Sequence, residues 1–183
     1  MASSHKTFRQ QRNLHSSLAE HLEHGGVLSI GRRKVFRPIA IKRPMHLVFR
    51  AANAKGQFSL LQPQHARVVR HLLKRWACYF EVRVYEFANS GNHLHVLVKS
   101  KTRPGLQNFL RVFAGQVAQR VTGAEKGSPY GKRFWMLLVY SKIIFWGRAF
   151  LAVKQYVVRN RLEALGLIAY RARTRRRMAT RGP

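Results

Sequence analysis

Two histidines separated by one residue are the first feature of this sequence that could carry chemistry. His93 and His95 flank Leu94 and lead into the apolar run 96–98, a pattern typical of a β-strand. Alternate side chains of a strand share a face, so both imidazoles point one way and Leu94 points the other way. Two imidazoles on one face are good ligands for a divalent metal ion. Two polar residues on the solvated face of a sheet are the alternative interpretation.

A tyrosine and an asparagine four residues apart form the second such feature. Tyr156 and Asn160 lie in a segment with helical character, and residues at this spacing share one face of a helix. A tyrosine hydroxyl can act as a covalent nucleophile where the group it attacks is polarised and the surroundings are positive. The Asn160 carbonyl oxygen could complete a metal site begun by two histidines. An amphipathic helix with a tyrosine at its edge is the alternative.

The charge balance narrows the chemistry. The chain of 183 residues has 35 Lys and Arg against 6 acidic residues, a net charge of +29, and it contains no aspartate. Such a charge attracts polyanions, and nucleic acid is the expected partner. A nuclease with two metal ions needs a cluster of acidic ligands, which six scattered glutamates do not provide. Any metal ion used for cleavage is therefore expected to be held mainly by other side chains, histidine above all.

The elements that must position these residues follow from periodicity and turn signals. The pattern predicts, in order, a strand at 45–51, a helix opening at Gln62-Pro63, a strand at 81–88, a turn at 89–92, a strand at 93–99, a helix from Pro104 to about 121, an extended apolar segment at 134–146, and a helix at 148–165 closed by Gly166. This order indicates an α+β fold of the ferredoxin-like, split βαβ type. We expect an antiparallel sheet with helices on one face and an added C-terminal helix that carries Tyr156.

The chain divides by composition into three parts. Residues 1–40 are predicted to be a basic arm, 41–170 one domain, and 171–183 an Arg-rich disordered tail. Cys78 is the only cysteine, which excludes an intramolecular disulfide and a cysteine-based zinc site. No secretion signal is visible, and the longest apolar run is too short to cross a bilayer. We expect a cytoplasmic protein, associated with a bacterial nucleoid and not with a membrane.

Taken together, these features resemble the insertion-sequence-200-like, single-tyrosine transposases, including the REP-associated tyrosine transposases. That family belongs to the HUH class, named for a His-hydrophobic-His motif. The resemblance covers roughly residues 42–168 and rests on the first strand 45–50, the motif 92–98 and the late helix that begins its motif at Tyr156. Asparagine directly before the histidine pair and an amide residue four positions after the tyrosine are typical of the family. Arg161 departs from it, because REP-associated members commonly have proline there.

The resemblance implies a reaction and a role for four residues. His93 and His95 correspond to ligands of a single Mg or Mn ion, Asn160 to the third protein ligand, and Tyr156 to the nucleophile. The implied reaction cleaves single-stranded DNA, leaves a 5′-phosphotyrosine on the enzyme and a free 3′-hydroxyl, and is reversed when another 3′-hydroxyl attacks. Hairpin or repeat ends are the implied substrate. Both a monomer and a homodimer stay open.

Further residues are expected around this centre. His46 and Arg50 share a face of the first strand and could line a DNA channel. Glu86 could accept a hydrogen bond from a ligand histidine and orient it. Three tryptophans, Trp76, Trp135 and Trp146, could stack on bases. Trp76 lies on the apolar stripe of its helix, so packing in the core is the alternative for that residue. The candidates for phosphate contacts after the histidine strand are Lys99, Lys101, Arg103 and Arg111.

Two other functions fit part of the pattern. A nucleic-acid-binding protein without catalysis, whether a degenerate transposase or an RNA-binding module, would have the same charge and fold. RNA-recognition modules carry stacking aromatics on their central strands, whereas the strand 93–99 has two histidines and no aromatic ring apart from them. A ribosome-associated basic protein would explain the charge and the Arg-rich tail but not the conjunction of the histidine pair, Tyr156 and Asn160.

Overall fold

The fold is a single antiparallel sheet with helices on both of its faces. The computed structural model describes residues 22–33, 35–51 and 53–170, so the tail 171–183 and most of the N-terminal arm lie outside the described residues. The sheet has five strands in the order β1-β5-β2-β4-β3, and each neighbouring pair is antiparallel. The strands and helices are β1 Glu23–His24, β2 Met45–Arg50, α2 Pro63–Tyr79, β3 Val82–Asn89, β4 His93–Ser100, α3 Arg103–Thr122, β5 Tyr140–Ile143 and α4 Arg148–Ala164, with short 3-10 turns at Gly26–Ser29 and Gly56–Phe58. The predicted fold class and the predicted order of elements from 45 to 165 are confirmed.

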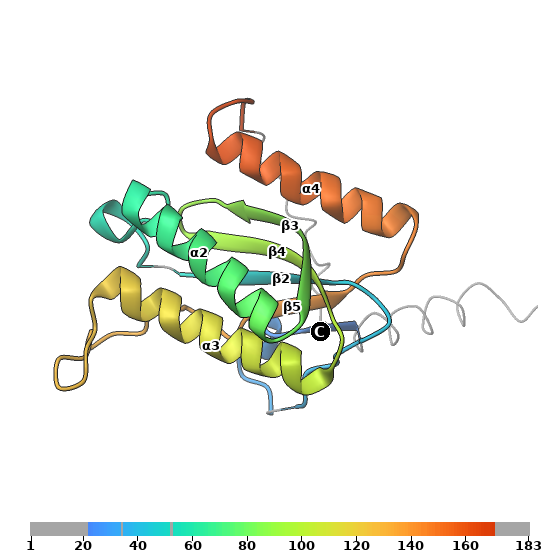
Figure 1. The fold of residues 1–183 in the computed structure, drawn as a ribbon, viewed down its shortest axis with the longest axis horizontal. Coiled ribbons are helices and arrows are strands. Elements are labelled where there is room, and N and C mark those ends of the chain that lie inside the picture. The colour runs from blue at the N-terminus through green and yellow to red at the C-terminus, as the bar shows by residue number, and fades with distance from the viewer. Residues whose placement is uncertain (1–21, 34, 52, 171–183) are drawn as a thin grey trace, which may run out of the picture.

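The main core lies between the sheet and the helix pair α2 and α3. Figure 1 shows these two helices side by side across one face of the sheet. Leu47 and Phe49 of β2 and Leu94 and Val96 of β4 are fully buried there, and Phe49 packs edge-on against Phe113 of α3. Every second residue of β2 and β4 thus points into this core. The residues between them, His93 and His95 included, must face the other way.

Local signals explain where the two core helices begin and end. Pro63 occupies the first turn of α2, where its missing N–H costs no hydrogen bond. The Thr102 side chain caps α3 by accepting a hydrogen bond of 3.0 Å from the backbone N–H of Gly105. At its other end α3 stops at Gly123, which has the left-handed conformation common after helices (φ 70°).

Helix α4 covers part of the opposite face of the sheet. It packs against β3 and β4 and is set apart from α2 and α3 in Figure 1. Val157 of α4 and Leu97 of β4 are fully buried on this side. The burial of this apolar stripe fixes the rotation of α4 and therefore the direction in which Tyr156 and Asn160 point.

The N-terminal arm contributes a strand that the sequence pattern did not indicate. Glu23 and His24 pair with Lys142 and Ser141 of β5 and close that edge of the sheet. The chain then turns at Gly25, whose φ of 81° is unfavourable for other residues and whose missing Cβ makes room for the backbone carbonyl of Val139. The extended segment predicted at 134–146 is a strand only over β5 and otherwise connects α3 to β5 and β5 to α4.

Among the described residues, no helix is both long and apolar enough to cross a membrane.

Candidate active site

His93 and His95 lie side by side on the sheet face that α4 partly covers. Their ring centroids are 4.8 Å apart, with the planes close to perpendicular. His95 is only 4% exposed, whereas His93 is half-buried. The turn 89–92 sets the start of this strand, because the Asn89 side chain accepts a hydrogen bond from the Gly91 backbone N–H. The structure therefore places the two imidazoles on one face, as predicted.

Tyr156 of α4 lies against His95 and against His46 of β2. Its ring centroid is 5.4 Å from that of His95 and 5.9 Å from that of His46, with edge-on geometry in both pairs. Tyr156 and His95 line the same cavity. Residues 61 positions apart in the sequence thus meet because α4 returns across the face of β4.

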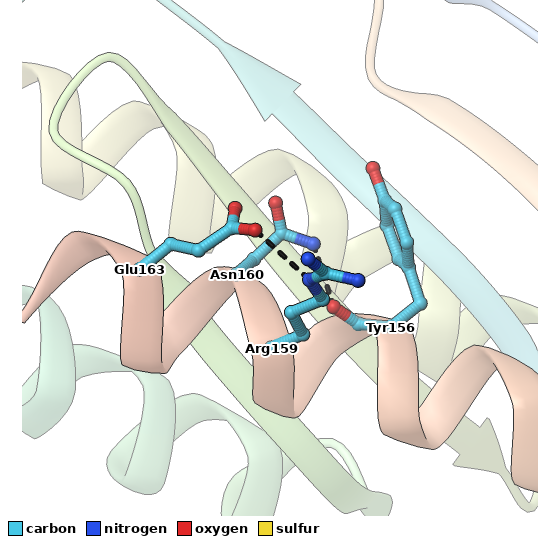
Figure 2. A network of polar contacts seen from close by, with 4 residues as sticks. All are labelled: Tyr156, Arg159, Asn160 and Glu163. Carbon is cyan, nitrogen blue, oxygen red and sulfur yellow. Dashed lines mark hydrogen bonds and ion pairs between the residues drawn. The ribbon is translucent and has the colours of Figure 1, made fainter. Parts of the chain in front are cut away.

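Asn160 is buried one helical turn after Tyr156. Only 3% of the residue is exposed, and its side-chain Nδ2 donates a 2.6 Å hydrogen bond to the backbone carbonyl oxygen of Tyr156. This bond fixes the orientation of the amide group. Figure 2 shows the Asn160 carbonyl oxygen and the Tyr156 hydroxyl both turned away from the helix axis toward the same side. The helix thus presents one oxygen acceptor next to one phenol.

A third histidine completes the cluster. His46 of β2 is 8% exposed, its ring stacks on that of His95, and its Nε2 lies 3.1 Å from Nδ1 of His95. Burial, assisted by the positive charge of Lys142, lowers the pKa of His46 to about 4. His46 is therefore neutral at physiological pH. Its position, under the expected site and against a ligand candidate, favours orienting His95 over direct contact with DNA.

The cavity in front of these residues has a volume of about 410 Å³. Its walls come from five segments of the chain, and the lining residues are Gly26, Val27, Val48, Arg50, Asn92, His93, His95, Leu137, Leu138, Tyr140 and Tyr156. The predicted Arg50 is among them, so a guanidinium group lies at the cavity wall. The residues from 26–27 and 137–140 were not anticipated, because only long-range pairing brings the arm and the segment before β5 to this place.

Tyr140 is a second tyrosine in the same cavity. Its pKa is raised by burial, by the negative charge of Glu23 and by a hydrogen bond with that carboxylate. Glu23 in turn forms an ion pair of 2.6 Å with Lys142. Because Tyr140 stays protonated in these surroundings, it is poorly suited to act as a nucleophile.

The predicted phosphate contacts do not gather at this cavity. Lys99 and Lys101 line a separate and larger depression of about 830 Å³ at the far ends of β3 and β4. Arg103 is exposed at the start of α3, directly after this segment. Arg111 is exposed on α3, where its guanidinium group donates to the Asn108 side chain. The basic residues are therefore spread over two faces of the molecule.

Glu86 fastens α4 to the sheet. Its carboxylate forms an ion pair of 2.6 Å with Arg161 of α4 and also accepts a hydrogen bond from the Phe87 backbone N–H. Orientation of a ligand histidine by Glu86 stays a prediction, and the contacts described here favour anchoring of the helix that carries Tyr156. Arg161, the residue at which the sequence departs from the resemblance, thus has a structural partner in Glu86.

The donor atoms at this site suit a single metal ion. Within the described part of the chain, no group of three or more His, Cys, Asp or Glu residues could hold a metal ion. The candidate set is instead two imidazoles on β4 and the amide oxygen of Asn160, which is buried on α4 one helical turn after Tyr156. Nitrogen ligands with one neutral oxygen fit a divalent transition ion or, with added water, magnesium. The residues present therefore fit the metal that the resemblance implies.

Comparisons with known proteins identify the family and a similar fold. A family profile described as "Transposase IS200 like" matches residues 41–160. A solved structure of a REP-associated tyrosine transposase bound to a REP hairpin is similar, with a TM-score of 0.58 at 14% identity over 75% of this chain and 76% of that chain. A candidate transposase from Deinococcus radiodurans has a TM-score of 0.43 at 16% identity, covering 70% of this chain and 98% of that chain. No curated protein matches the sequence.

Proposed function

The chain belongs to the IS200-like transposase family, and from that premise we propose that it cleaves and rejoins single-stranded DNA through a covalent bond to Tyr156. One observation carries this proposal above the others. The Tyr156 ring lies 5.4 Å from the His95 ring in a cavity that His93 also lines, and Asn160 is buried on the same helix. A nucleophile, a candidate metal site and a positive wall are thus within reach of one phosphate group.

The proposed metal ligands are Nε2 of His93, Nε2 of His95 and the carbonyl oxygen of Asn160. The Nδ1 of His93 lies 2.6 Å from the Asn92 side-chain oxygen and the Nδ1 of His95 lies 3.1 Å from His46. With protons on both Nδ1 atoms, Asn92 and neutral His46 accept hydrogen bonds and hold the rings in the tautomer that a metal ion requires. A bound Mg or Mn ion supplies polarisation of the scissile phosphate.

The protein's own groups account for the rest of the proposed reaction. The Tyr156 oxygen attacks phosphorus, the bond from phosphorus to the 3′ oxygen breaks, and the phenolic proton is transferred to that departing oxygen. The products are a 5′-phosphotyrosine and a free 3′-hydroxyl. Arg50 at the cavity wall offsets the charge that develops on the phosphate oxygens. Attack by another 3′-hydroxyl reverses these bond changes, so no nucleoside triphosphate is consumed.

The proposed substrate is single-stranded DNA next to a hairpin or repeat end. The net charge of +29 supports a polyanionic partner. The similar REP-associated transposase was solved with a REP hairpin, which supports a structured DNA end as the target of this chain as well. We assign the activity to residues 41–170 and an electrostatic role in DNA capture to the basic segments on either side.

The proposal is tested by covalent capture. The protein is incubated with labelled single strands taken from the DNA that flanks its gene, together with Mg or Mn, and the products are separated on a denaturing gel. A labelled adduct that requires metal and is lost in Tyr156→Phe and His93→Ala is expected. If no flanking strand gives an adduct while tight, salt-sensitive binding persists, the protein is a DNA-binding remnant and not a nuclease.

A further inference from the structure

A cluster of aromatic side chains lies at the start of α4, on the chain that leaves β5. Trp146 packs against Phe150 with ring centroids 5.0 Å apart, and both rings contact Tyr85 of β3. Tyr85 sits at an irregularity in the pairing of β3 with β4, which directs it toward this side of the sheet. Phe145 precedes Trp146 in the chain. We call these four residues the aromatic platform.

The aromatic platform is open to solvent at Phe145 and Trp146. Phe145 is 46% exposed and Trp146 is 48% exposed, although buried positions are usual for such residues. The indole N–H of Trp146 donates to the backbone carbonyl of Lys42 at 3.1 Å, which holds the edge of the ring in place. The ring is therefore positioned by a hydrogen bond at its edge, while the residue as a whole stays about half exposed.

Positive charges surround the aromatic platform. The Arg43 guanidinium carbon lies 4.0 Å from the centroid of Phe145, and that of Arg83 lies 5.2 Å from the centroid of Tyr85. Tyr85 also forms part of the wall of the 830 Å³ depression, which we call the basic groove; its cationic lining residues are Lys42, Arg83, Lys99 and Lys101. Exposed rings interleaved with cations beside a groove are the arrangement by which proteins bind unpaired nucleotides.

The aromatic platform is separate from the candidate active site but within reach of the same strand. Tyr156 follows the first residue of α4, Arg148, by eight positions, a distance of about 12 Å along the helix axis. Stacked nucleotides rise by about 3.4 Å each, so roughly three to four of them would span the interval. A single strand held at Tyr156 can therefore extend to the start of α4, which follows Trp146 by two residues.

We propose that the aromatic platform and the basic groove form a second binding site for single-stranded DNA, in which bases stack on Phe145 and Trp146 and phosphates contact the groove cations. The proposal rests on the proposed function in so far as single-stranded DNA is the substrate. It assigns to this site a role in holding the unpaired strand that leads away from the scissile phosphate. It also gives Lys99 and Lys101 a function away from the metal site.

The test measures binding alone, in the presence of a chelator so that no cleavage occurs. The full chain is titrated into a fluorescein-labelled oligothymidylate of about 20 nucleotides, longer than one typical site, and into a duplex and an abasic strand of equal length. Trp146→Ala and Phe145→Ala are expected to weaken binding of the single strand between about fivefold and about 100-fold. The same variants should change binding of the duplex and of the abasic strand by less than about twofold. Tyr79→Ala is the matched control, because Tyr79 is an exposed aromatic on α2 outside the groove lining.

The conservative variant Trp146→Phe distinguishes a loss of base stacking from a loss of folding. It keeps a stacking ring, so it should retain most of the affinity, while quenching of tryptophan fluorescence by the oligonucleotide should disappear with the indole. Single-strand affinity that is unchanged in Trp146→Ala, or quenching that persists in Trp146→Phe, would overturn the proposal. So would an equal loss of affinity for duplex and single strand.

The two proposals fail in different ways. A metal-dependent adduct together with normal binding by Trp146→Ala would support the proposed reaction and contradict the second binding site. Trp146-dependent binding without any adduct would support the second binding site and contradict the proposed reaction.

Discussion

The side-chain nitrogen of Asn160 lies 2.6 Å from the backbone carbonyl oxygen of Tyr156, one helical turn earlier. This hydrogen bond links the proposed third metal ligand to the proposed nucleophile within one helix. Because this bond engages the side-chain nitrogen with the backbone, the amide oxygen is the atom that we propose as the metal donor. The spacing of four residues therefore sets the position of the proposed ligand and the orientation of its amide group.

Replacement of Asn160 should show whether its side-chain oxygen binds the metal ion. Asn160→Leu keeps the volume but removes the oxygen, so half-maximal adduct formation should require at least about 10- to 100-fold more Mn. Asn160→Asp keeps an oxygen ligand and should retain more activity than Asn160→Leu. The measurement is adduct yield against metal concentration, with thermal melting as the control for folding. Equal metal requirements for wild type and Asn160→Leu would remove Asn160 from the ligand set.

His46 is predicted to act through His95. His46→Phe preserves a stacked ring but removes the acceptor 3.1 Å from His95 Nδ1, so metal affinity should fall about 10- to 100-fold while DNA binding without metal stays the same. Metal titration by calorimetry and DNA binding in chelator give the two readouts. His71→Phe, at an exposed position on α2, is the control. A loss of metal-free DNA affinity in His46→Phe would instead support the original expectation that His46 lines the DNA channel.

The two tyrosines of the cavity, Tyr156 and Tyr140, should differ in their effect on formation of the covalent adduct. Tyr156→Phe removes the nucleophile and should abolish the adduct. Tyr140→Phe should retain adduct formation within about threefold, because burial and Glu23 raise the pKa of Tyr140 and keep it protonated. Parallel adduct assays at one metal concentration decide the matter. An adduct that survives in Tyr156→Phe and is lost in Tyr140→Phe would identify Tyr140, and not Tyr156, as the nucleophile.

Gly25 is predicted to secure the arm against β5. In Gly25→Ala the new Cβ would clash with the Val139 carbonyl oxygen, and the positive φ at this position is unfavourable for alanine. The free energy of unfolding should therefore fall by about 1–3 kcal/mol. The loss should be local, with faster amide exchange in β1 and β5 and little change in α2 and α3. Gly31→Ala is the control, since that glycine also has a positive φ but no neighbour in the way. Equal destabilisation by both substitutions would show that backbone angle alone, and not the packing of the arm, is responsible.

The sequence pattern predicts much of this fold because the main signals are local. The alternation around His93 and His95 identifies β4 and the face of each side chain, and the four-residue spacing places Tyr156 and Asn160 together on α4. What the pattern could not supply depends on pairing between distant segments. Glu23 and His24 have no strand signature of their own and become a strand only through β5.

Distant pairing also explains the other differences. The sequence predicts that His46 lines a DNA channel, and it does not predict the burial of this side chain, because that burial depends on the approach of His95 and Tyr156 from other elements. Tyr140 joins the cavity only because β5 inserts between β1 and β2. Lys99 seemed close to the metal site because it shares a strand with the histidines, yet four residues of extended chain carry it about 13 Å away. Nearness in sequence was a poor guide to which cations share a surface.

The central claim is that Tyr156 forms the covalent bond to DNA, and peptide mapping of the adduct tests it most directly. Trypsin releases residues 155–159 with Tyr156 as their only tyrosine, and residues 134–142 with Tyr140 as theirs. After nuclease trimming, mass spectrometry should find the nucleotide on the peptide 155–159, bound through its 5′-phosphate, and a free 3′-hydroxyl on the released DNA. A nucleotide on 134–142, a 3′-phosphate linkage, or cleaved DNA with no modified peptide would contradict the account.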